Sequence, residues 1–199
     1  MSNEAASERA VPAQPPAEGR AASGKRREAT VLEARALGHP LRLRILRLCS
    51  EAELTNKQIA DRLGRDPGTV LYHVRQLVDA GFLEQGAVRT GESGALEKPY
   101  RSTGKSWWLE NPAGAGPAAV GIAPIEAFQE ELAEAGPDSV ATFARFTLHL
   151  SPAEVAELDR RIVAVLDEFM ETDRDRSDRP ALGGLFVLHR LAGPPPAAP

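Results

Sequence analysis

Two short amphipathic segments, 55–64 and 66–81, follow each other almost without a break, and this arrangement constrains the fold more than any other feature. The first has the pattern of a capping box, Thr55 with Gln58, and stops at Gly64. The second opens on an aspartate cap and a proline at the first helical position. The sequence therefore predicts two helices joined through a glycine.

The elements on either side of this pair are also marked in the sequence. A short helix is expected to end near Gly38, and Pro40 suits the first position of the next helix. Two strand candidates, 82–89 and 98–109, follow the pair and are separated by a glycine-containing turn. The residues expected to be buried on the helices are Leu41, Ile45, Leu48, Cys49, Ile59, Ala60, Leu63, Val70, Val74, Leu77 and Val78.

Two helices followed by a hairpin describe a winged helix-turn-helix. An α-helix fits the major groove of B-DNA, where each base pair shows a distinct pattern of donors and acceptors. Helix 67–81 is expected in that groove, and hairpin 82–109 is expected to act as a wing on the neighbouring one. Packing against the wing is an equal alternative for His73. The predicted DNA contacts are Arg42, Arg44, Lys57, Thr69, Tyr72, His73, Arg75, Gln76, Arg89, Lys98 and Arg101.

Charge is unevenly distributed along the chain. Residues 20–108 carry a net charge of +6, whereas residues 109–199 carry −8. A basic segment can bind an anionic polymer, and an acidic segment cannot. This asymmetry favours DNA as the partner of the first half and indicates another role for the second half.

Several stretches of the first half resemble the ArsR type of winged-helix regulator. Residues 36–46 (ALGHPLRLRIL) resemble the first signature of that family. Residues 66–77 (DPGTVLYHVRQL) with 80–83 (AGFL) resemble its recognition helix and first wing strand, and 98–103 (KPYRST) resemble the return strand. The resemblance covers residues 29–109. It implies a DNA-binding transcriptional regulator, usually a homodimer, with double-stranded DNA as its partner.

The sequence departs from the metal-sensing members of that family. Those members carry a cysteine pair near the third helix, or paired Asp and His on the last helix. Here residues 53–57 contain no cysteine, and the helix predicted over 124–134 contains no histidine. We therefore expect no metal and no cofactor. The single cysteine, Cys49, is expected to be a buried small hydrophobe, and Leu71, where the family commonly has a small polar residue, is expected to join the buried stripe.

The acidic half predicts a small βαβ-like unit. Ser151 and Glu154 form the pattern of a capping box that opens a long amphipathic helix. Strand-like runs flank that helix at 143–150, where apolar and polar residues alternate, and at 185–191. The second run is nearly all apolar, which indicates burial on both faces.

A two-stranded sheet is marginal by itself, so the acidic module needs a partner. Pairing with a second copy is one expected remedy, and packing on Trp107, Trp108 and the 124–134 helix is the other. Two roles stay open: a structural dimerisation module, or an effector site whose apolar crevice and acidic rim suit an apolar or cationic ligand. On the helix over 124–134, the predicted dimerisation residues are Ile125, Phe128 and Leu132.

The predicted fold class is α+β: a winged helix-turn-helix domain followed by a helix and a small βαβ-like accessory module. The expected divisions are a disordered tail over 1–28, the DNA-binding domain over 29–109, a linker over 110–117, the accessory module over 118–191 and a disordered tail over 192–199.

The favoured function is a cytoplasmic, homodimeric transcriptional regulator that reads an inverted repeat. The sequence shows no apolar window long enough for a membrane span and no signal stretch, and one cysteine fits a reducing compartment. No nucleophile–base–acid arrangement is visible, so we expect no enzyme. The alternative is a winged helix used for protein–protein assembly without sequence-specific DNA binding.

Overall fold

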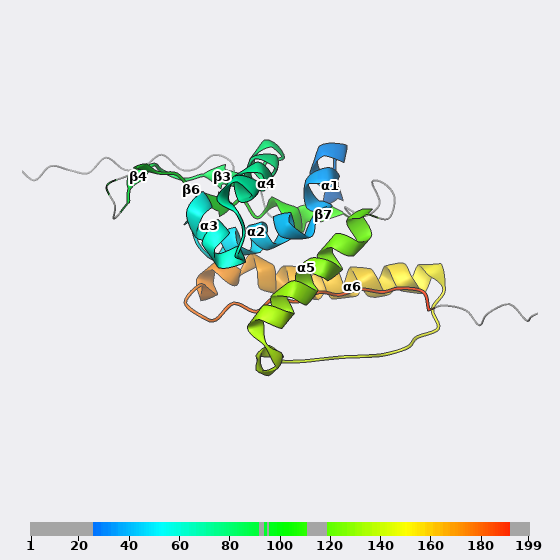
Figure 1. Ribbon diagram of the computed structural model, residues 1–199. Helices are drawn as coiled ribbons and strands as arrows, with labels where there is room; N and C mark the ends of the chain where they lie inside the picture. The colour runs from blue at the N-terminus through cyan, green and yellow to red at the C-terminus, as the bar shows by residue number, and fades with distance from the viewer. Residues whose placement is uncertain (1–25, 92–93, 95, 111–118, 192–199) are drawn as a thin grey trace, which may run out of the picture.

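The protein has a mixed helix and sheet fold, seen in a computed structural model that describes residues 26–91, 94, 96–110 and 119–191 (Figure 1). The helices are α1 (Val31–Leu37), α2 (Pro40–Glu51), α3 (Asn56–Leu63), α4 (Pro67–Asp79), α5 (Ala119–Ala135) and α6 (Pro152–Glu171). The strands are β1 (Arg27–Glu28), β2 (Leu54–Thr55), β3 (Leu83–Gln85), β4 (Arg89–Thr90), β5 (Leu96–Glu97), β6 (Pro99–Ser102) and β7 (Leu109–Glu110). Short 3₁₀ turns are η1 (Lys105–Trp108), η3 (Pro137–Ser139) and η4 (Asp173–Arg176).

The helix boundaries follow the predicted caps. The hydroxyl of Thr55 accepts a hydrogen bond from the Gln58 backbone N–H, and the Thr55 backbone N–H donates one to the side-chain oxygen of Gln58, which completes the capping box of α3. Gly64 ends α3 in a left-handed conformation, with φ of 58°, where glycine carries no steric cost. The Asp66 side chain then caps α4. These local hydrogen bonds explain why the turn between the two helices is short.

Helices α1 to α4 surround one hydrophobic core. Its fully buried side chains include Ile45, Ile59, Val74 and Phe82. Each such side chain contributes about 1.5–3 kcal/mol through removal from water. The core is closed on one side by a three-stranded antiparallel sheet in the order β2-β6-β3. Val78 was expected in the buried stripe of α4, but it is 37% exposed, because the buried face of the helix is formed by Val70, His73, Val74 and Leu77.

The hairpin that projects from this core has an irregular second strand. Strands β4 and β5 pair antiparallel and extend the hairpin beyond the three-stranded sheet (Figure 1). The predicted strand over 98–109 is only partly correct, since β6 ends at Ser102 and the chain turns through η1. Gly104, with φ of 74°, starts that turn, and the hydroxyl of Thr103 anchors it by donating to the carbonyl oxygens of Gly81 and Phe82.

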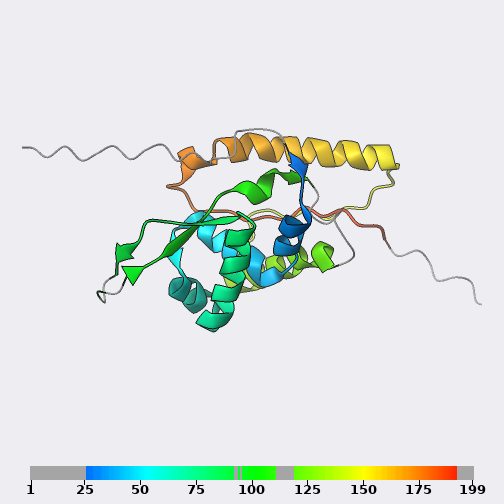
Figure 2. The same ribbon diagram turned by 90° about the horizontal axis from the view of Figure 1, so that it is seen from above.

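Helix α5 packs on the winged core, whereas α6 hardly does. Ala123 and Ala127 are buried on α5, which contacts α2, and the helix begins before the predicted boundary with Pro124 inside it. No residue of α6 is buried, although Ser151 and Glu154 form its predicted capping box. Figure 2 shows α6 running along one side of the molecule, apart from α1 to α4.

The predicted βαβ-like unit does not form within one chain. The chain over 140–150 and 181–191 is drawn out as straight traces (Figure 1), but neither segment belongs to a strand pair among the described residues. A strand requires backbone hydrogen bonds to a neighbouring strand, and neither segment has such a neighbour in the described part of the chain.

The predictions for 1–25, 111–118 and 192–199, which cover most of both tails and the linker, lie outside the described residues. Within the described part of the chain, no helix has the length and apolarity needed to cross a membrane.

Candidate nucleic-acid interface

The turn between α3 and α4 is held by hydrogen bonds that leave the start of α4 exposed. The Asn56 side chain donates to the backbone oxygen of Pro67 over 2.9 Å, and the Arg65 backbone donates to the oxygen of Ala60 over 3.0 Å. Gly68 and Thr69, in the first turn of α4, are exposed. An exposed helix N-terminus presents backbone N–H groups and a positive dipole end, which suit a phosphate.

The outer face of α4 carries the side chains expected to contact bases. Tyr72 is 59% exposed, Arg75 and Thr69 are exposed, and Gln76 is half-buried. The opposite face is fixed in the core, so the outer face is presented in one orientation. Arginine and glutamine can each make paired hydrogen bonds to a purine edge in the major groove.

His73 lies beneath α4 and not on its outer face. Only 7% of it is exposed, and its ring centroid lies 4.5 Å from that of His39. The Arg42 Nη1 atom is 3.5 Å from His73 Nδ1. Burial, reinforced by the nearby His39 and Arg42, lowers the pKa of His73 to about 4. The prediction that His73 contacts DNA is therefore corrected: the ring is a neutral packing group under the helix.

Arg42 and Arg44 are also engaged inside the protein. Arg42 donates to the backbone oxygens of Ala36 and Arg35, over 2.5 and 2.6 Å, and so ties α2 to the end of α1. Arg44 is only 3% exposed, with Nη1 placed 2.5 Å from a carboxylate oxygen of Glu130.

The second partner of Arg44 is Glu134, one turn further along α5. Arg47, next on α2, is paired with Glu131 over 3.2 Å. The expected phosphate contact by Arg44 is corrected, because its guanidinium is covered by α5 and joins that helix to α2. The cluster of glutamates at 130, 131 and 134 was the sequence feature that indicated ion pairs between α5 and α2.

Of four other predicted phosphate contacts, three are exposed and Arg101 is half-buried, and three of the four lie in ion pairs. Lys57 pairs with Asp61 over 2.8 Å, Arg89 with Glu97 over 3.2 Å, and Arg101 with Glu84 over 2.7 Å. Lys98 is exposed between β5 and β6. An exposed ion pair contributes at most about 1 kcal/mol, so exchanging its carboxylate for a phosphate costs little.

Two arginines at the turn of the helix pair were not among the predicted contacts. Arg62 and Arg65 flank Gly64 and are exposed. Neither has a carboxylate within 4.0 Å in the described residues, and the same holds for Arg75 and Lys98. Their position beside the glycine that ends α3 was the signal that sequence reasoning passed over.

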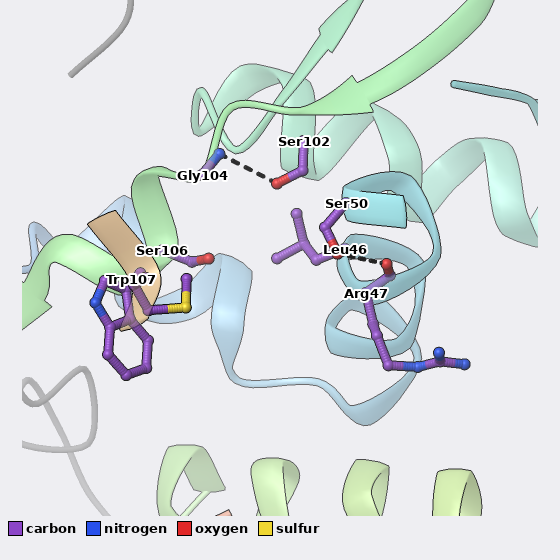
Figure 3. A pocket seen from close by; sticks show the side chains of 8 residues that line it. Leu46, Arg47, Ser50, Ser102, Gly104, Ser106 and Trp107 are labelled. Carbon is purple, nitrogen blue, oxygen red and sulfur yellow. Dashed lines mark hydrogen bonds between the residues drawn. The ribbon is translucent and has the colours of Figure 1, made fainter. Parts of the chain in front are cut away.

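An open pocket of about 300 Å³ lies where the winged core meets the end of α6 (Figure 3). Its lining includes Ser50, Ser102, Ser106, Arg47 and Met170. It contains no carboxylate, so the predicted acidic rim is absent from it. Without a histidine or carboxylate in the lining, nothing there activates a hydroxyl as a nucleophile.

No three His, Cys, Asp or Glu side chains lie together as potential metal ligands in the described ranges. Cys49 is buried as predicted, and burial raises the pKa of its thiol to about 12. Leu71 is half-buried beside the stripe it was expected to join.

Residues 37–86 match the family model of a helix-turn-helix domain. This match runs from the end of α1 to just beyond β3 and therefore includes α3, the turn and α4. A solved structure, that of the transcriptional regulator SlyA, is similar at 16% sequence identity with a TM-score of 0.28, covering 66% of this chain and 75% of that chain. At that level it adds nothing to the argument. A search of curated proteins found no match.

Proposed function

We propose that this chain is a DNA-binding transcriptional regulator of the winged helix-turn-helix type, without enzymatic activity, that acts as a homodimer in the cytoplasm. The observation that carries the proposal is the division of α4 into a buried face and an exposed polar face. Val70, Val74 and Leu77 hold the helix, while Tyr72 and Arg75 point away from the core. In this proposal α4 enters the major groove and the hairpin β3–β6 lies against the adjacent backbone.

Several charged side chains support this orientation. Arg62 and Arg65 lie at the turn that precedes α4, and Lys98 lies on the hairpin, so positive charge occurs on both sides of the helix. Thr69 and Gln76 complete the polar face. Arg75 and Gln76 are assigned to bases, and Lys57, Arg62, Arg65, Arg89, Lys98 and Arg101 are assigned to phosphates.

Within winged-helix regulators, the ArsR type is the branch proposed. The motifs over 36–46 and 66–77 support it, and the family-model match covers most of both. The metal-sensing function of that type is not proposed, because the cysteine pair is missing from 53–57.

A homodimer with two copies of α4 is proposed to read an inverted repeat with half-sites about one helical turn apart. On α5, Leu132 is 38% exposed, and Ile125 and Phe128 are half-buried, so an apolar edge stays available beside the face that packs on α2. Ile122, 55% exposed, extends that edge. This edge is the proposed dimerisation surface of α5.

The second candidate function is a winged helix that binds another protein. The ion pairs Arg89–Glu97 and Arg101–Glu84 favour it, because they reduce the positive potential of the hairpin. The two functions differ in their response to salt. Phosphate contacts release counterions, so DNA affinity falls steeply with salt concentration, whereas an apolar protein interface responds weakly.

The test is selection of bound duplexes from a random pool by the full-length protein, followed by a salt titration of the selected duplex. Recovery of an inverted repeat with a steep salt dependence supports the proposed function. Binding of all duplexes with equal affinity, or of none, supports the second candidate.

A further inference from the structure

Residues 140–150 and 181–191 behave as strands without neighbours. Both are extended, yet no backbone–backbone hydrogen bond reaches 141–150 or 180–191 from any described residue. Extended chain with apolar side chains and open N–H and C=O groups is a template for pairing with another strand. Among the described residues, the backbone N–H and C=O groups on both sides of each segment therefore have no strand partner.

Large apolar side chains on these segments and on α6 are exposed to solvent. Phe143 is 79% exposed and Leu182 is 81% exposed. On α6, Val165, Leu166 and Phe169 are all exposed, and no residue of this helix is buried. A helix of this kind derives most of its stability from packing its apolar face.

The two segments run in the same direction. Because α6 carries the chain back between them, both point along α6 opposite to its own direction, as Figures 1 and 2 show. They are nevertheless not bonded to each other as parallel strands. A strand running the opposite way between them would satisfy the facing backbone groups of both.

We infer that this intervening strand is residues 181–191 of a second copy of the same chain. A twofold axis then generates a four-stranded antiparallel sheet, in the order 140–150, the partner's 181–191, 181–191, and the partner's 140–150. The two central strands pair with each other across the axis, and each copy fills the opening left by the other. The contact is isologous, so one set of residues completes both halves.

The character of each segment agrees with its place in this sheet. Leu185, Phe186, Val187 and Leu188 form an uninterrupted apolar run, as expected of a central strand covered on both faces. Residues 143–150 alternate and carry Arg145 and His149, as expected of an edge strand with one open face. In the view of Figure 2, the trace of 181–191 runs between α6 and the winged part of the molecule.

Size favours a second copy, and the like charge that two copies bring to the shared sheet is limited to Arg145 and Arg190. Neither segment contains an aspartate or glutamate, although 109–199 carries a net charge of −8. The acidic groups of two modules therefore do not face each other across the shared strands. Together with the apolar face of α6, the two segments comprise about 25 residues, within the 20–30 residues per side of a stable interface.

This inference rests on the proposed function only for the expectation of a dimer, and it is tested without DNA. Single cysteines are introduced into the full-length chain at each position from 185 to 190, and the proteins are oxidised. Cys49 remains in every variant, because it is buried. In an antiparallel pair the distance between a residue and its own copy grows by about 7 Å per residue from the axis. A disulfide needs Cα atoms within about 7 Å, so only one or two adjacent positions should link.

Thr147→Cys is the matched control within the sheet. Its two copies lie on opposite edges, about 14 Å apart across three strand spacings, and should not link to each other. Ser177→Cys, exposed outside the sheet, controls for random collision. A mixture of Thr147→Cys with the 185–190 variants should link in at least one combination. We expect the best position of 185–190 to link at least about tenfold faster than either control.

Self-linking of Thr147→Cys, or no linking anywhere over 185–190, overturns the inferred sheet, whether light scattering reports a monomer or a dimer. A second variant, Val187→Pro, removes a ladder hydrogen bond and should raise the dissociation constant of the dimer about tenfold or more. An unchanged dissociation constant also overturns the sheet. Linking at 185–190 in a protein that fails to select DNA leaves the sheet standing and rejects the proposed function alone.

Discussion

The indole N–H of Trp107 donates a hydrogen bond to the carboxylate of Asp167 over 2.7 Å and joins the base of the wing to α6. Arg26 completes the contact: one guanidinium nitrogen lies 2.8 Å from the same Asp167 oxygen, and its carbon lies 4.7 Å from the centre of the Trp107 ring. All three side chains are partly buried. This cluster is the polar attachment of the acidic half to the winged half of the chain. Packing of the acidic module on Trp107 was one of the two expectations, but Asp167 and Arg26 were not identified as its partners.

Asp167→Asn should lower the free energy of unfolding by about 1–2 kcal/mol, because the guanidinium and the indole lose a charged acceptor. Urea denaturation of the full-length protein measures this. Asp159→Asn, exposed on the same helix, should change stability by less than about 0.5 kcal/mol. Equal effects of the two substitutions would show that the cluster contributes nothing specific.

Arg75→Ala should weaken binding to the selected duplex by about 1–3 kcal/mol and relax the preference at one base position. A mobility-shift series on the selected duplex and single-base variants measures both effects. Arg174→Ala removes the same charge from an exposed site on the acidic module and should leave affinity unchanged. An Arg75→Ala protein that matches its parent on every duplex would remove α4 from the interface.

Arg44→Met should reduce stability by about 1–3 kcal/mol, since Glu130 and Glu134 of α5 lose their ion pairs with the buried Arg44 guanidinium. The double change Glu130→Gln with Glu134→Gln should cost more, because it leaves a buried charge without partners. Folded Arg44→Met protein should keep the parent's salt slope of DNA binding, whereas Lys98→Ala should reduce that slope by about 1. A reduced slope for Arg44→Met would restore Arg44 as a phosphate contact.

The burial of His73 beside His39 predicts that the folded protein loses stability in mild acid. The folded-state pKa of His73 is about 4, below its ordinary 6.5, so protonation favours the unfolded chain. Its stabilising contribution is complete above pH 6.5 and is lost as the pH falls toward 4, by up to about 3 kcal/mol. The pKa of the adjacent His39 is lowered too, mainly by burial.

His73→Gln should therefore flatten the dependence of unfolding free energy on pH between 6.5 and 4.5. Urea titrations at several pH values measure the slope. A parent protein equally stable at both ends of this range would exclude the buried neutral state.

Phe128→Glu with Leu132→Glu should shift the dimer toward monomer, because two charges are placed on the apolar edge of α5. Light scattering over a concentration series should show the dissociation constant rising at least about tenfold. Gln129→Glu, on an exposed position of the same helix, is the control. A dimer unaffected by the double change would assign dimerisation to surfaces other than α5.

The parts of the fold that were predictable are those set by neighbours in the sequence. The capping boxes at Thr55 and Ser151 and the glycine stop at Gly64 depend on residues within one or two turns. The helical stripe of α4 was also largely predictable, and the same periodicity places His73 next to Val70 and Leu77. The spacing of His73 from Val70 and Leu77 therefore predicted its burial, but its polar side chain was taken as a sign that it lies on the outer face.

The features that were missed depend on distant segments. Arg44 is covered by α5, which lies more than eighty residues away, and its spacing from Leu41 and Leu48 alone does not identify the cover. The strand pattern of 143–150 and 185–191 describes the residues correctly as extended, but a strand assignment requires a hydrogen-bonding neighbour. That neighbour is not supplied within one chain among the described residues.

The contact of Arg44 with Glu130 and Glu134 has a consequence for how recognition can diverge between relatives of this chain. These ion pairs attach α5 to α2, and α2 packs against α4. In the proposed dimer, a shift in how two copies of α5 meet would therefore move both copies of α4 with it. Substitutions on the α5 edge would then change the distance between half-sites. Substitutions on the outer face of α4 would change the bases that are recognised.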